Sequence, residues 1–326
     1  MPRVLVTGGA GFVGSNYVRA LLSGAYPAWR EADVTVLDRL TYAGDRANLE
    51  PVKERLVFVQ GDICDEDLLA DLVPGHDVVI NFAAESHVDR SIADSSAFVR
   101  TNVLGVQRLL QACLDAGSCR FVQVSTDEVY GSIETGSWDE DTPLAPNSPY
   151  SAAKAGGDLI ARAYVRTHGL PVSITRCGNN YGPYQYPEKI IPLFVTRLLR
   201  GQTVPLYGDG ANVRDWIHVD DHCRGIQLVA ERGEPGEVYH IAGTAELTNI
   251  ELTQRLLDAC GAGWDRVERV QDRKGHDRRY SLSDAKLRKL GYEPRIAFED
   301  GLRETVRWYE ANRDSWEPLR RPRAVA

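Results

Sequence analysis

A glycine-rich turn directly after the first apolar segment is the feature that most restricts how this chain can fold. Val4–Thr7 is a short apolar run that predicts a strand, and Gly8, Gly11 and Gly14 follow it in the spacing G-x-x-G-x-x-G. Such glycines let the backbone turn tightly, approach a pyrophosphate and pack the next helix on the strand. That helix, amphipathic from Val13 on, would offer free N–H groups and its positive dipole end to phosphates. A glycine turn alone is a weak signal, but this context predicts a dinucleotide site.

The second predicted strand specifies the dinucleotide. Val34–Leu37 is apolar and ends at Asp38, near the distance from the glycine turn at which an acid binds the adenosine ribose hydroxyls. A carboxylate there repels a 2′-phosphate, so the sequence predicts NAD rather than NADP. Arg39 keeps NADP open, because an arginine beside this position can accept that phosphate. The alternative interpretation of Arg39 is a solvated loop charge.

Two further strands are predicted at Leu56–Val59 and Asp77–Asn81, and both are followed by residues suited to the cofactor. A turn after the first could contact the adenine edge, and small residues after the second would let the dinucleotide lie close to the sheet. These residues are Asp62, Ile63, Ala83 and Ala84. His87, a little further on, could equally contact a substrate or be an ordinary loop histidine.

Reactive side chains follow the next predicted strand. Phe121–Val124 is apolar and ends in Ser125, Thr126, Asp127 and Glu128. Ligands of open α/β sheets bind beyond the carboxyl ends of strands, so a hydroxyl and two adjacent carboxyl groups would lie where chemistry is expected.

A helix predicted at 150–168 adds two more candidate groups. Tyr150 and Lys154 stand four residues apart and therefore on one helix face. Together with Thr126 and the acid pair, they suggest a sugar-nucleotide dehydratase.

Composition limits the other possibilities. The formal net charge of −8 disfavours a nucleic-acid or polybasic membrane binder, although a local basic pocket remains possible. The six cysteines form no metal-ligand spacing, so we expect no metal site and free thiols in a reducing compartment. The first strand begins too early for a signal peptide, and no apolar run approaches the roughly 18 residues of a membrane span. We therefore expect a cytoplasmic protein.

The predicted fold class is α/β: a doubly wound parallel Rossmann sheet with a smaller C-terminal substrate-binding lobe. The expected division is an NAD-binding domain at 1–177 and a sugar-nucleotide lobe at 178–326, with some segments returning to the first domain. A long helix is predicted at 91–116, and its apolar residues cover more of the helix surface than the single stripe that packing on one core requires. That face could be buried in its own subunit, or it could pack on a partner chain beside the helix at 150–168.

Several long motifs carry a resemblance that covers nearly the whole chain. They are TGGAGFVGS (7–15), LTYAG (40–44), AAESHVDRSI (83–92), STDEVYG (125–131), NSPYSAAKAG (147–156), NNYGPYQYPEK (179–189), LYGDGANVRDWIHVDDH (206–222) and DRKGHDRRYS (272–281). With them, the chain resembles the extended short-chain dehydrogenase/reductase family and, within it, the dTDP-glucose 4,6-dehydratase family. Two departures affect cofactor-loop detail: Asp45 replaces a common asparagine, and Gly178 occupies a variable position.

The resemblance implies an NAD cofactor, dTDP-glucose as substrate and a homodimer joined by helices 91–116 and 150–168. It implies that NAD is contacted by Gly8, Gly11, Phe12, Gly14, Asp38, Asp62, Ile63 and Lys154. It assigns catalysis to Thr126, Asp127, Glu128 and Tyr150, supported by Lys154. Residues implied to approach the sugar nucleotide are Ser86, His87, Asn179, Lys189, Arg214, Asn249, Arg273, His276 and Tyr280.

These residue types fit an oxidation followed by an elimination. Tyr150, as a phenolate favoured by Lys154 and the nicotinamide charge, would take the C4 hydroxyl proton, with Thr126 bonded to the same oxygen. Glu128 would remove the C5 proton and Asp127 would protonate the departing C6 hydroxyl, a division that suits two mutually repelling carboxyl groups.

Three alternatives remain open. A UDP-sugar 4-epimerase shares the fold, NAD, tyrosine and lysine, but related epimerases carry no acid pair after the Ser/Thr. A GDP-mannose-type dehydratase would use similar acids. A noncatalytic NAD-sensing protein would not need the acid pair together with Tyr150 and Lys154.

Overall fold

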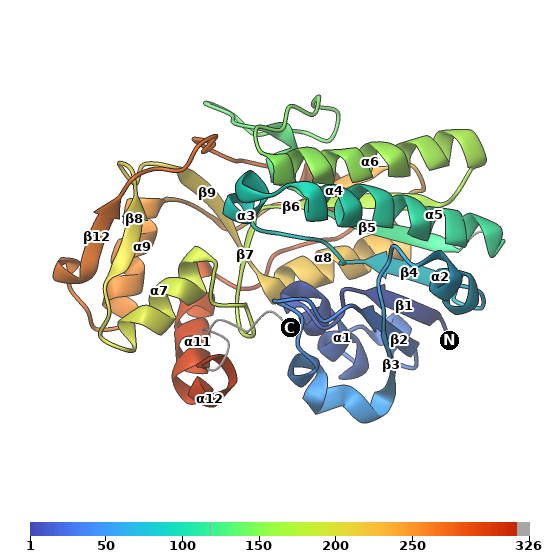
Figure 1. Ribbon diagram of the computed structural model, residues 1–326, viewed down its shortest axis with the longest axis horizontal. Coiled ribbons are helices and arrows are strands. Elements are labelled where there is room, and N and C mark those ends of the chain that lie inside the picture. The colour runs from blue at the N-terminus through green and yellow to red at the C-terminus, as the bar shows by residue number, and fades with distance from the viewer. Residues whose placement is uncertain (118, 318–326) are drawn as a thin grey trace.

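A seven-stranded parallel sheet forms the centre of the molecule. The computed structural model describes residues 1–117 and 119–317 (Figure 1). In sheet order the strands are β10 (Val238–Ile241), β6 (Val172–Cys177), β5 (Arg120–Thr126), β4 (Val78–Asn81), β1 (Arg3–Thr7), β2 (Asp33–Asp38) and β3 (Leu56–Gln60). The order reverses between β1 and β4, which creates the crevice where open α/β sheets bind ligands.

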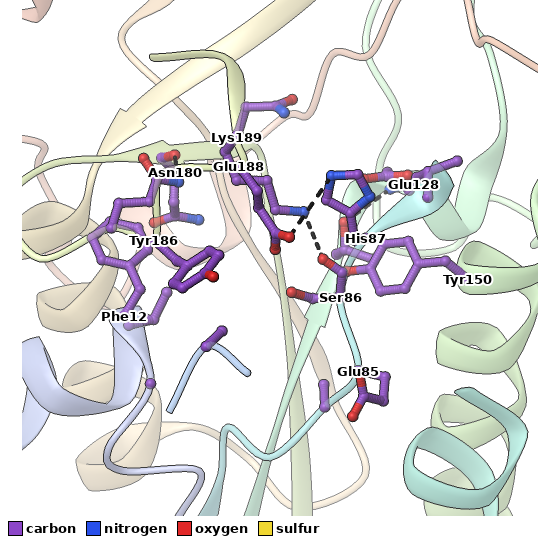
Figure 2. A pocket seen from close by; sticks show the side chains of 18 of the residues that line it. Phe12, Glu85, Ser86, His87, Glu128, Tyr150, Asn180, Tyr186, Glu188 and Lys189 are labelled. Atoms are coloured by element: carbon purple, nitrogen blue, oxygen red, sulfur yellow. Dashed lines mark hydrogen bonds and ion pairs between the residues drawn. The ribbon is translucent and has the colours of Figure 1, made fainter. Parts of the chain in front are cut away.

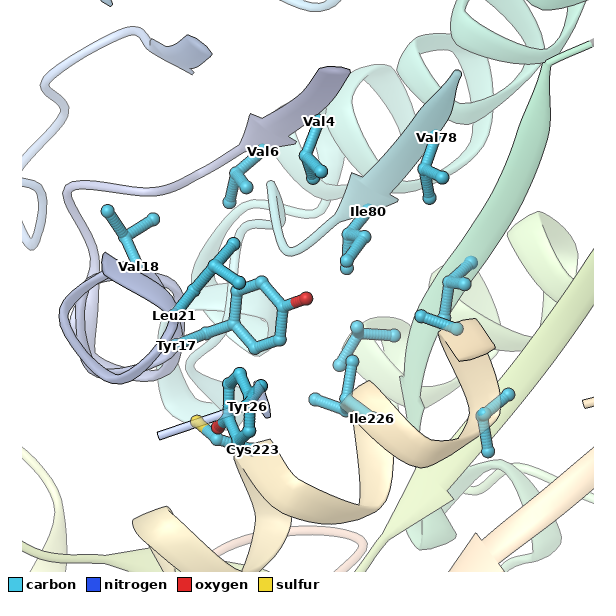
Figure 3. Packing of buried hydrophobic residues seen from close by; sticks show 14 of the residues in the cluster. Val4, Val6, Tyr17, Val18, Leu21, Tyr26, Val78, Ile80, Cys223 and Ile226 are labelled. Atoms are coloured by element: carbon cyan, nitrogen blue, oxygen red, sulfur yellow. The ribbon is translucent and has the colours of Figure 1, made fainter. Parts of the chain in front are cut away.

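Helices cover both faces of this sheet, as the predicted doubly wound class requires. On one face α1 (Phe12–Leu22) and α8 (Val219–Arg232) pack on the strands through residues such as Tyr17, Leu21 and Ile226 (Figure 3). On the other face lie α2 (Glu66–Leu72), α5 (Val106–Asp115) and α6 (Pro149–His168). Strands β1, β4, β5, β6 and β10 are buried on both sides, as strands of a covered parallel sheet are, whereas the edge strand β3 is partly exposed.

The remaining segments form a second, smaller lobe. Its sheets contain β7 (Asn179–Tyr181), β9 (Val213–His218) and β11 (Ala245–Thr248), and separately β8 (Val204–Tyr207) and β12 (Val267–Val270). Its helices are α7 (Ile190–Leu198), α9 (Asn249–Ala259), α11 (Phe298–Ala311) and α12 (Arg313–Trp316). The short helix α10 (Ala285–Arg288) instead packs on the large sheet beside β10. The chain also contains short 3-10 segments outside this lobe, which are η1 (Pro27–Trp29), η2 (Arg46–Arg55) and η4 (Asp127–Tyr130), and a further one, η5 (Trp264–Arg266), that precedes β12.

The chain crosses between the lobes more than once. After β7 enters the small lobe, α8 returns to pack on the large sheet and β10 joins its edge by pairing with β6. The division at residue 177 stays a prediction, and its last nine residues, 318–326, lie outside the described chain.

The single helix predicted at 91–116 is correct only in part: residues 96–115 are continuously helical, with a π turn inside, but a break at 94–95 separates them from the preceding helix. The segment is divided into α3 (Val88–Ala93), α4 (Ser96–Val99), the π-helical turn η3 (Arg100–Gly105) and α5. Asp94 is extended and its carboxylate accepts a hydrogen bond from Ser96 N (2.9 Å), which ends one helix and starts the next.

The π turn has a local function. It carries the buried Asn102, whose side chain bonds both the N–H (2.9 Å) and the C=O (3.0 Å) of Glu85 beside the crevice. The wider turn thus anchors the loop that follows β4.

Candidate active site

The glycine turn after β1 forms a cradle that only glycine can form. Gly8 has φ +70°, and a Cβ there would meet Ala83 N at 2.5 Å. A Cβ on Gly14 would meet Gly8 O at 2.3 Å. Gly11 caps α1 without a side chain, so the first N–H groups of this helix face the crevice. This close backbone approach at a helix N-terminus fits a pyrophosphate.

Asp38 ends β2 and is already oriented. Its carboxylate accepts hydrogen bonds from Ala10 N (2.9 Å) and Leu40 N (2.8 Å). Burial raises the pKa of Asp38, although the two backbone bonds oppose this. Arg39, which could have bound a 2′-phosphate, instead pairs with Asp62 (3.4 Å). The arrangement favours a free ribose 2′-hydroxyl and hence NAD.

The two departures from the family pattern have clear local explanations. Asp45 caps the segment after β2 by accepting a hydrogen bond from Ala47 N (2.9 Å), which an asparagine oxygen could also do. A Cβ on Gly178 would lie 2.6 Å from the backbone oxygen of Asp215, so only glycine fits there.

The two carboxyl groups after β5 lie in different surroundings. β5 runs two residues further than predicted, through Thr126, and the chain then enters the 3-10 turn η4. Asp127 is 2% exposed, and within the described chain its Oδ2 has no hydrogen-bond partner. Burial, and then the charges of Glu128 and Asp215, raise the pKa of Asp127 well above its usual value. These surroundings therefore favour the protonated form of Asp127, which is the form that a general acid needs.

Glu128 faces the start of α6. It is only half-buried and accepts a hydrogen bond from Ser151 Oγ (3.3 Å). Tyr150 lies beside it at the first turn of that helix (Figure 2).

The expected lowering of the Tyr150 pKa is not found in this structure. Burial, and then the charges of Glu128, Cys177 and Asp127, raise the Tyr150 pKa well above 10.0, with a hydrogen bond from Thr126 opposing them. Lys154 donates its Nζ proton to Val124 O (2.7 Å), and burial lowers the lysine pKa. The phenol is therefore protonated here, and its conversion to a base needs additional positive charge.

Opposite the acid pair, a loop of the small lobe meets the loop after β4. Lys189 donates from Nζ to Ser86 O (2.6 Å), and His87 Nε2 lies 4.0 Å from a Glu188 carboxylate oxygen (Figure 2). Burial, followed by the charge of Lys189, lowers the pKa of His87 to about 4. His87 is thus a neutral group facing the cavity.

The small lobe supplies a cationic wall. Arg214 is 5% exposed and donates to Val213 O (2.7 Å) and Asp277 O (2.9 Å), with its Cζ 4.2 Å from the Tyr280 ring centroid. Arg273 has a buried Nε that bonds to nothing else in the described residues. Two guanidinium groups in one wall suit a diphosphate.

One cavity brings together every site residue predicted from the sequence, although the role of each stays a prediction. The cavity is lined by Gly8, Gly11, Phe12, Val13, Gly14, Asp38, Asp62, Ile63, Ala83, Ala84, Ser86, His87, Thr126, Asp127, Glu128, Tyr150, Lys154, Asn179, Lys189, Arg214, Asn249, Arg273, His276 and Tyr280.

Sequence reasoning missed other groups at this cavity. Glu188, Asn180 and Gln185 also line it, and the last two have side-chain oxygens without partners among the described residues. All three lie in the motif NNYGPYQYPEK (179–189), one of those that carry the resemblance. Within residues 1–117 and 119–317, no group of three or more His, Cys, Asp or Glu is arranged to hold a metal ion. In the same ranges no helix is long and apolar enough to cross a bilayer.

Comparisons with known proteins agree with this geometry. Residues 5–305 match the family model described as GDP-mannose 4,6 dehydratase. A dTDP-glucose 4,6-dehydratase of Streptomyces niveus is 60% identical over 98% of this chain and 96% of its own length. The dTDP-glucose 4,6-dehydratase of Streptomyces antibioticus is also 60% identical, over 98% of this chain and 95% of its own length.

Solved structures give the same result and also show how widely the fold is shared. The dTDP-glucose 4,6-dehydratase DesIV of Streptomyces venezuelae, with NAD and dTDP bound, superimposes with a TM-score of 0.96 at 65% identity, covering 98% of this chain and 100% of that one. A Thermus thermophilus UDP-glucose 4-epimerase with NAD superimposes with a TM-score of 0.87 at 32% identity. The match covers 95% of this chain and 99% of the epimerase. Full-length identity to the dehydratases is about twice that to the epimerase, so this chain belongs to the dTDP-glucose 4,6-dehydratase family of extended short-chain dehydrogenase/reductases.

Proposed function

We propose that this chain is an NAD-dependent hydro-lyase that converts dTDP-glucose into dTDP-4-keto-6-deoxyglucose and water. The observation that carries the proposal is the buried Asp127, whose pKa is raised, beside Glu128 in one cavity with Tyr150 and Lys154. The curated relatives are dTDP-glucose 4,6-dehydratases, which supports the same substrate.

The residues present fit NAD. The cradle of Gly8, Gly11 and Gly14 would hold the pyrophosphate, and Asp38 the adenosine ribose. Asp62, Ile63, Ala83 and Ala84 would lie along the adenosine half, with Phe12 and Val13 at the start of α1. When bound, NAD accepts a hydride from C4 of the sugar and returns it to C6.

At C4, Tyr150 and Thr126 act on one oxygen. Tyr150 takes the hydroxyl proton as that carbon is oxidised, and Thr126, which bonds Tyr150, holds the oxygen in place. Lys154, fixed by Val124 O, supplies positive charge on the same helix face and favours the phenolate. The resulting ketone makes the C5 proton acidic.

At C5 and C6 the two carboxyl groups divide the elimination. Glu128, as a carboxylate, removes the C5 proton. Asp127, as a neutral acid, gives its proton to the C6 hydroxyl, so the C6–O bond breaks and water leaves. The difference in burial between the two groups supports this assignment.

The cationic wall binds the nucleotide diphosphate. Arg214 and Arg273 are the main phosphate ligands, because planar guanidinium groups match phosphate oxygens. The other residues assigned to the sugar nucleotide are Ser86, His87, Asn179, Lys189, Asn249, His276 and Tyr280.

We also propose a homodimer that works in the cytoplasm. Apolar side chains remain exposed near the helices at 91–116 and 150–168, for example Val99 (53%) and Leu159 (54%). All six cysteines are free, which fits a reducing compartment.

One assay tests the activity. The purified protein is incubated separately with dTDP-glucose, UDP-glucose and GDP-mannose in heavy water. We expect a 4-keto-6-deoxy product from dTDP-glucose, with deuterium at C5. Formation of a C4 epimer without loss of water would favour the epimerase alternative, and no change in any sugar would favour a binding protein.

A further inference from the structure

A row of buried polar residues lies beneath the acid pair and is not used by the proposed chemistry. Ser125, Arg176 and His240 are in register on the adjacent parallel strands β5, β6 and β10. Paired residues on neighbouring strands point to the same face, so the three side chains share one side of the sheet. Their exposed fractions are 4%, 0% and 0%.

An ion pair connects this row to α6. Arg176 Nε donates to Asp158 Oδ2 at 2.9 Å, and Ser125 Oγ donates to the same oxygen at 3.0 Å. Asp158 is fully buried and lies one helical turn beyond Lys154. Burial alone would lower the pKa of Arg176, but Asp158 and Tyr130 reverse this, so the guanidinium remains charged.

The hydrogen bonds continue in one direction through Tyr130. Arg176 donates from Nη1 to Tyr130 Oη (2.5 Å), so the tyrosine hydrogen is free to bond His240 Nε2 (2.7 Å). His240 must then carry its own proton on Nδ1, which faces Ser283 O (3.1 Å). Burial lowers the pKa of His240 to about 3 and raises that of Tyr130 to about 12, so neither group changes its role near neutral pH.

These contacts hold both ends of the catalytic turn. Ser125 directly precedes Thr126, Asp127 and Glu128, and Tyr130 ends the same 3-10 turn. Both ends are bonded to a single buried ion pair, Arg176–Asp158. A buried ion pair is weak support for stability because its desolvation cost can exceed its Coulomb gain. A role in fixing geometry explains its presence better.

We propose that the Ser125–Asp158–Arg176–Tyr130 chain is a positioning device that fixes Asp127 and Glu128 for the elimination step. These are positioning residues, since they act through the turn and not on the substrate. The inference rests on the proposed function. Oxidation at C4 should depend less on Tyr130, because Tyr150 and Lys154 also have contacts outside the hydrogen-bonded chain: Lys154 bonds Val124 O (2.7 Å) and Tyr150 N bonds Ser91 Oγ (3.1 Å).

Tyr130→Phe is the most selective test. It keeps the ring, which stacks on Trp138 with centroids 5.1 Å apart, and removes only the hydroxyl. We expect KM to stay within about twofold, whereas kcat falls on the order of ten- to hundredfold, as small misplacements of catalytic groups produce. In a single turnover, reduced-nicotinamide absorbance should rise at the wild-type rate and then persist, because elimination is slowed.

Tyr239→Phe is the matched control. Tyr239 is also buried, adjoins His240 in β10 and accepts a hydrogen bond from Glu234 N (2.8 Å), but it lies outside the chain. Removing the Tyr239 hydroxyl should leave kcat unchanged. Ser125→Ala removes the hydrogen bond to Asp158 at the other end of this hydrogen-bonded chain. It should show the same fall in kcat and the same persistent reduced-nicotinamide absorbance as Tyr130→Phe. If Tyr130→Phe does not fold, Ser125→Ala tests the proposal in its place.

Two results would overturn the positioning proposal while leaving the function intact. One is that Tyr130→Phe and Ser125→Ala both have the same kcat as Tyr239→Phe. The other is that nicotinamide reduction slows by the same factor as kcat, because the defect would then not be specific to elimination. If the wild type itself forms no product from dTDP-glucose, the proposed function fails, and the positioning proposal fails with it.

Discussion

Asp127 and Glu128 are neighbours in sequence but have different chemical properties in the fold. Asp127 is buried with a raised pKa, whereas Glu128 is half-buried and bonded to Ser151. From these environments we expect Asp127 to act as the acid and Glu128 as the base of the elimination. Amide variants of the two residues should separate these roles.

Glu128→Gln should oxidise C4 and then stop, because the base for C5 is missing. With dTDP-glucose it should accumulate reduced-nicotinamide absorbance and show little exchange of the C5 proton with heavy water. Asp127→Asn retains the base and loses the acid, so it should also accumulate that absorbance, but with C5 exchange. For a group in general acid–base catalysis we expect kcat to fall by about 10²–10⁴ in each.

Tyr150→Phe serves as the comparison, since it should show neither signal. The raised pKa of Tyr150 further predicts that the rate of C4 oxidation increases with pH, because deprotonation creates the base. Free C5 exchange in Glu128→Gln but not in Asp127→Asn would reverse the assignment. Wild-type turnover in both would make the carboxyl pair structural.

Asp215 gives a prediction about stability. It is 4% exposed, and burial raises its pKa from 3.8 to about 7, although a bond from Gly243 N (2.7 Å) opposes this. The unfolded chain therefore loses this proton at lower pH than the folded chain, and stability falls as pH rises between these values. Asp215→Asn should remove that loss and gain on the order of 1–3 kcal/mol at neutral to mildly alkaline pH, relative to its effect in acid.

Urea unfolding at about pH 4 and about pH 8 would measure this gain. Asp209→Asn is the control, because hydrogen bonds from Ala211 N and Arg278 lower the pKa of this exposed carboxyl. Its variant should lose rather than gain stability as pH rises. An Asp215→Asn difference independent of pH would show that folding does not raise the pKa of Asp215.

For individual residues, the sequence predicted which side chains lie together in the cavity, but it did not predict their pKa values. The acid pair, tyrosine and lysine follow from their positions after a strand and on one helix face. The pKa of Tyr150 could not be predicted, because it depends on Glu128, Cys177 and Asp127, whose closeness is set by two separate strands and a turn. The Ser125–Asp158–Arg176–Tyr130 chain was missed for the same reason.

Two loops meet over the cofactor end of the cavity. Tyr42, after β2, donates to Glu188 (2.9 Å), which also pairs with Arg90 (3.3 Å). The Arg90 guanidinium carbon lies 3.6 Å from the Tyr42 ring centroid. These contacts connect the loop beside Asp38 to the small lobe and would hinder departure of bound NAD.

Tyr42→Phe and Glu188→Gln should therefore release NAD faster. Loss of one hydrogen bond at a charged group corresponds to roughly a tenfold change. The measurement is the NAD content of purified protein after extended dialysis. Tyr164→Phe is a suitable control, since this hydroxyl bonds Gln111 (2.9 Å) on the outer helices. Equal NAD retention in all three variants would exclude a role for the bridge.

The elements themselves were largely predictable. The strands near residues 4, 34, 78, 121 and 172 are rich in apolar residues because the sheet is covered on both faces there, and the strand near residue 56 is apolar although it lies at the partly exposed edge. The helix predicted at 91–116 was correct from 96 to 115, but the break at Asp94 and the π turn were not predicted. The π turn carries Asn102, which bonds Glu85, and such a tertiary contact has no local signal in the sequence.

For the whole molecule, fold class follows from the alternation of strands and helices, whereas lobe membership does not. β10 belongs to the large sheet through pairing with β6, although it lies between segments of the small lobe. Oligomeric state depends on which apolar residues remain exposed. The helices at the outer face leave Ile92, Val99, Leu104 and Leu159 exposed by 41%, 53%, 38% and 54%.

We expect these four residues to cover one another in a symmetric dimer. A C2 interface uses the same patch on both copies, and exposed apolar patches of this kind mark interaction surfaces. Val106, an apolar residue of the same 91–116 segment, is only 1% exposed and belongs to the core of its own subunit. Introducing a charge at Val106 would therefore test folding rather than assembly, and the exposed leucines are the correct positions.

Leu104→Asp and Leu159→Asp should each convert the dimer to a monomer at micromolar concentration, because each would place two uncompensated charges in a desolvated interface. Sedimentation velocity measures the change, and circular dichroism checks that the fold is retained. Val57→Asp provides the control: Val57 is 62% exposed but lies on the edge strand β3, away from these helices, and its variant should remain dimeric. A wild-type protein that sediments as a monomer would contradict the dimer, and dimers in both leucine variants would place the interface on another face.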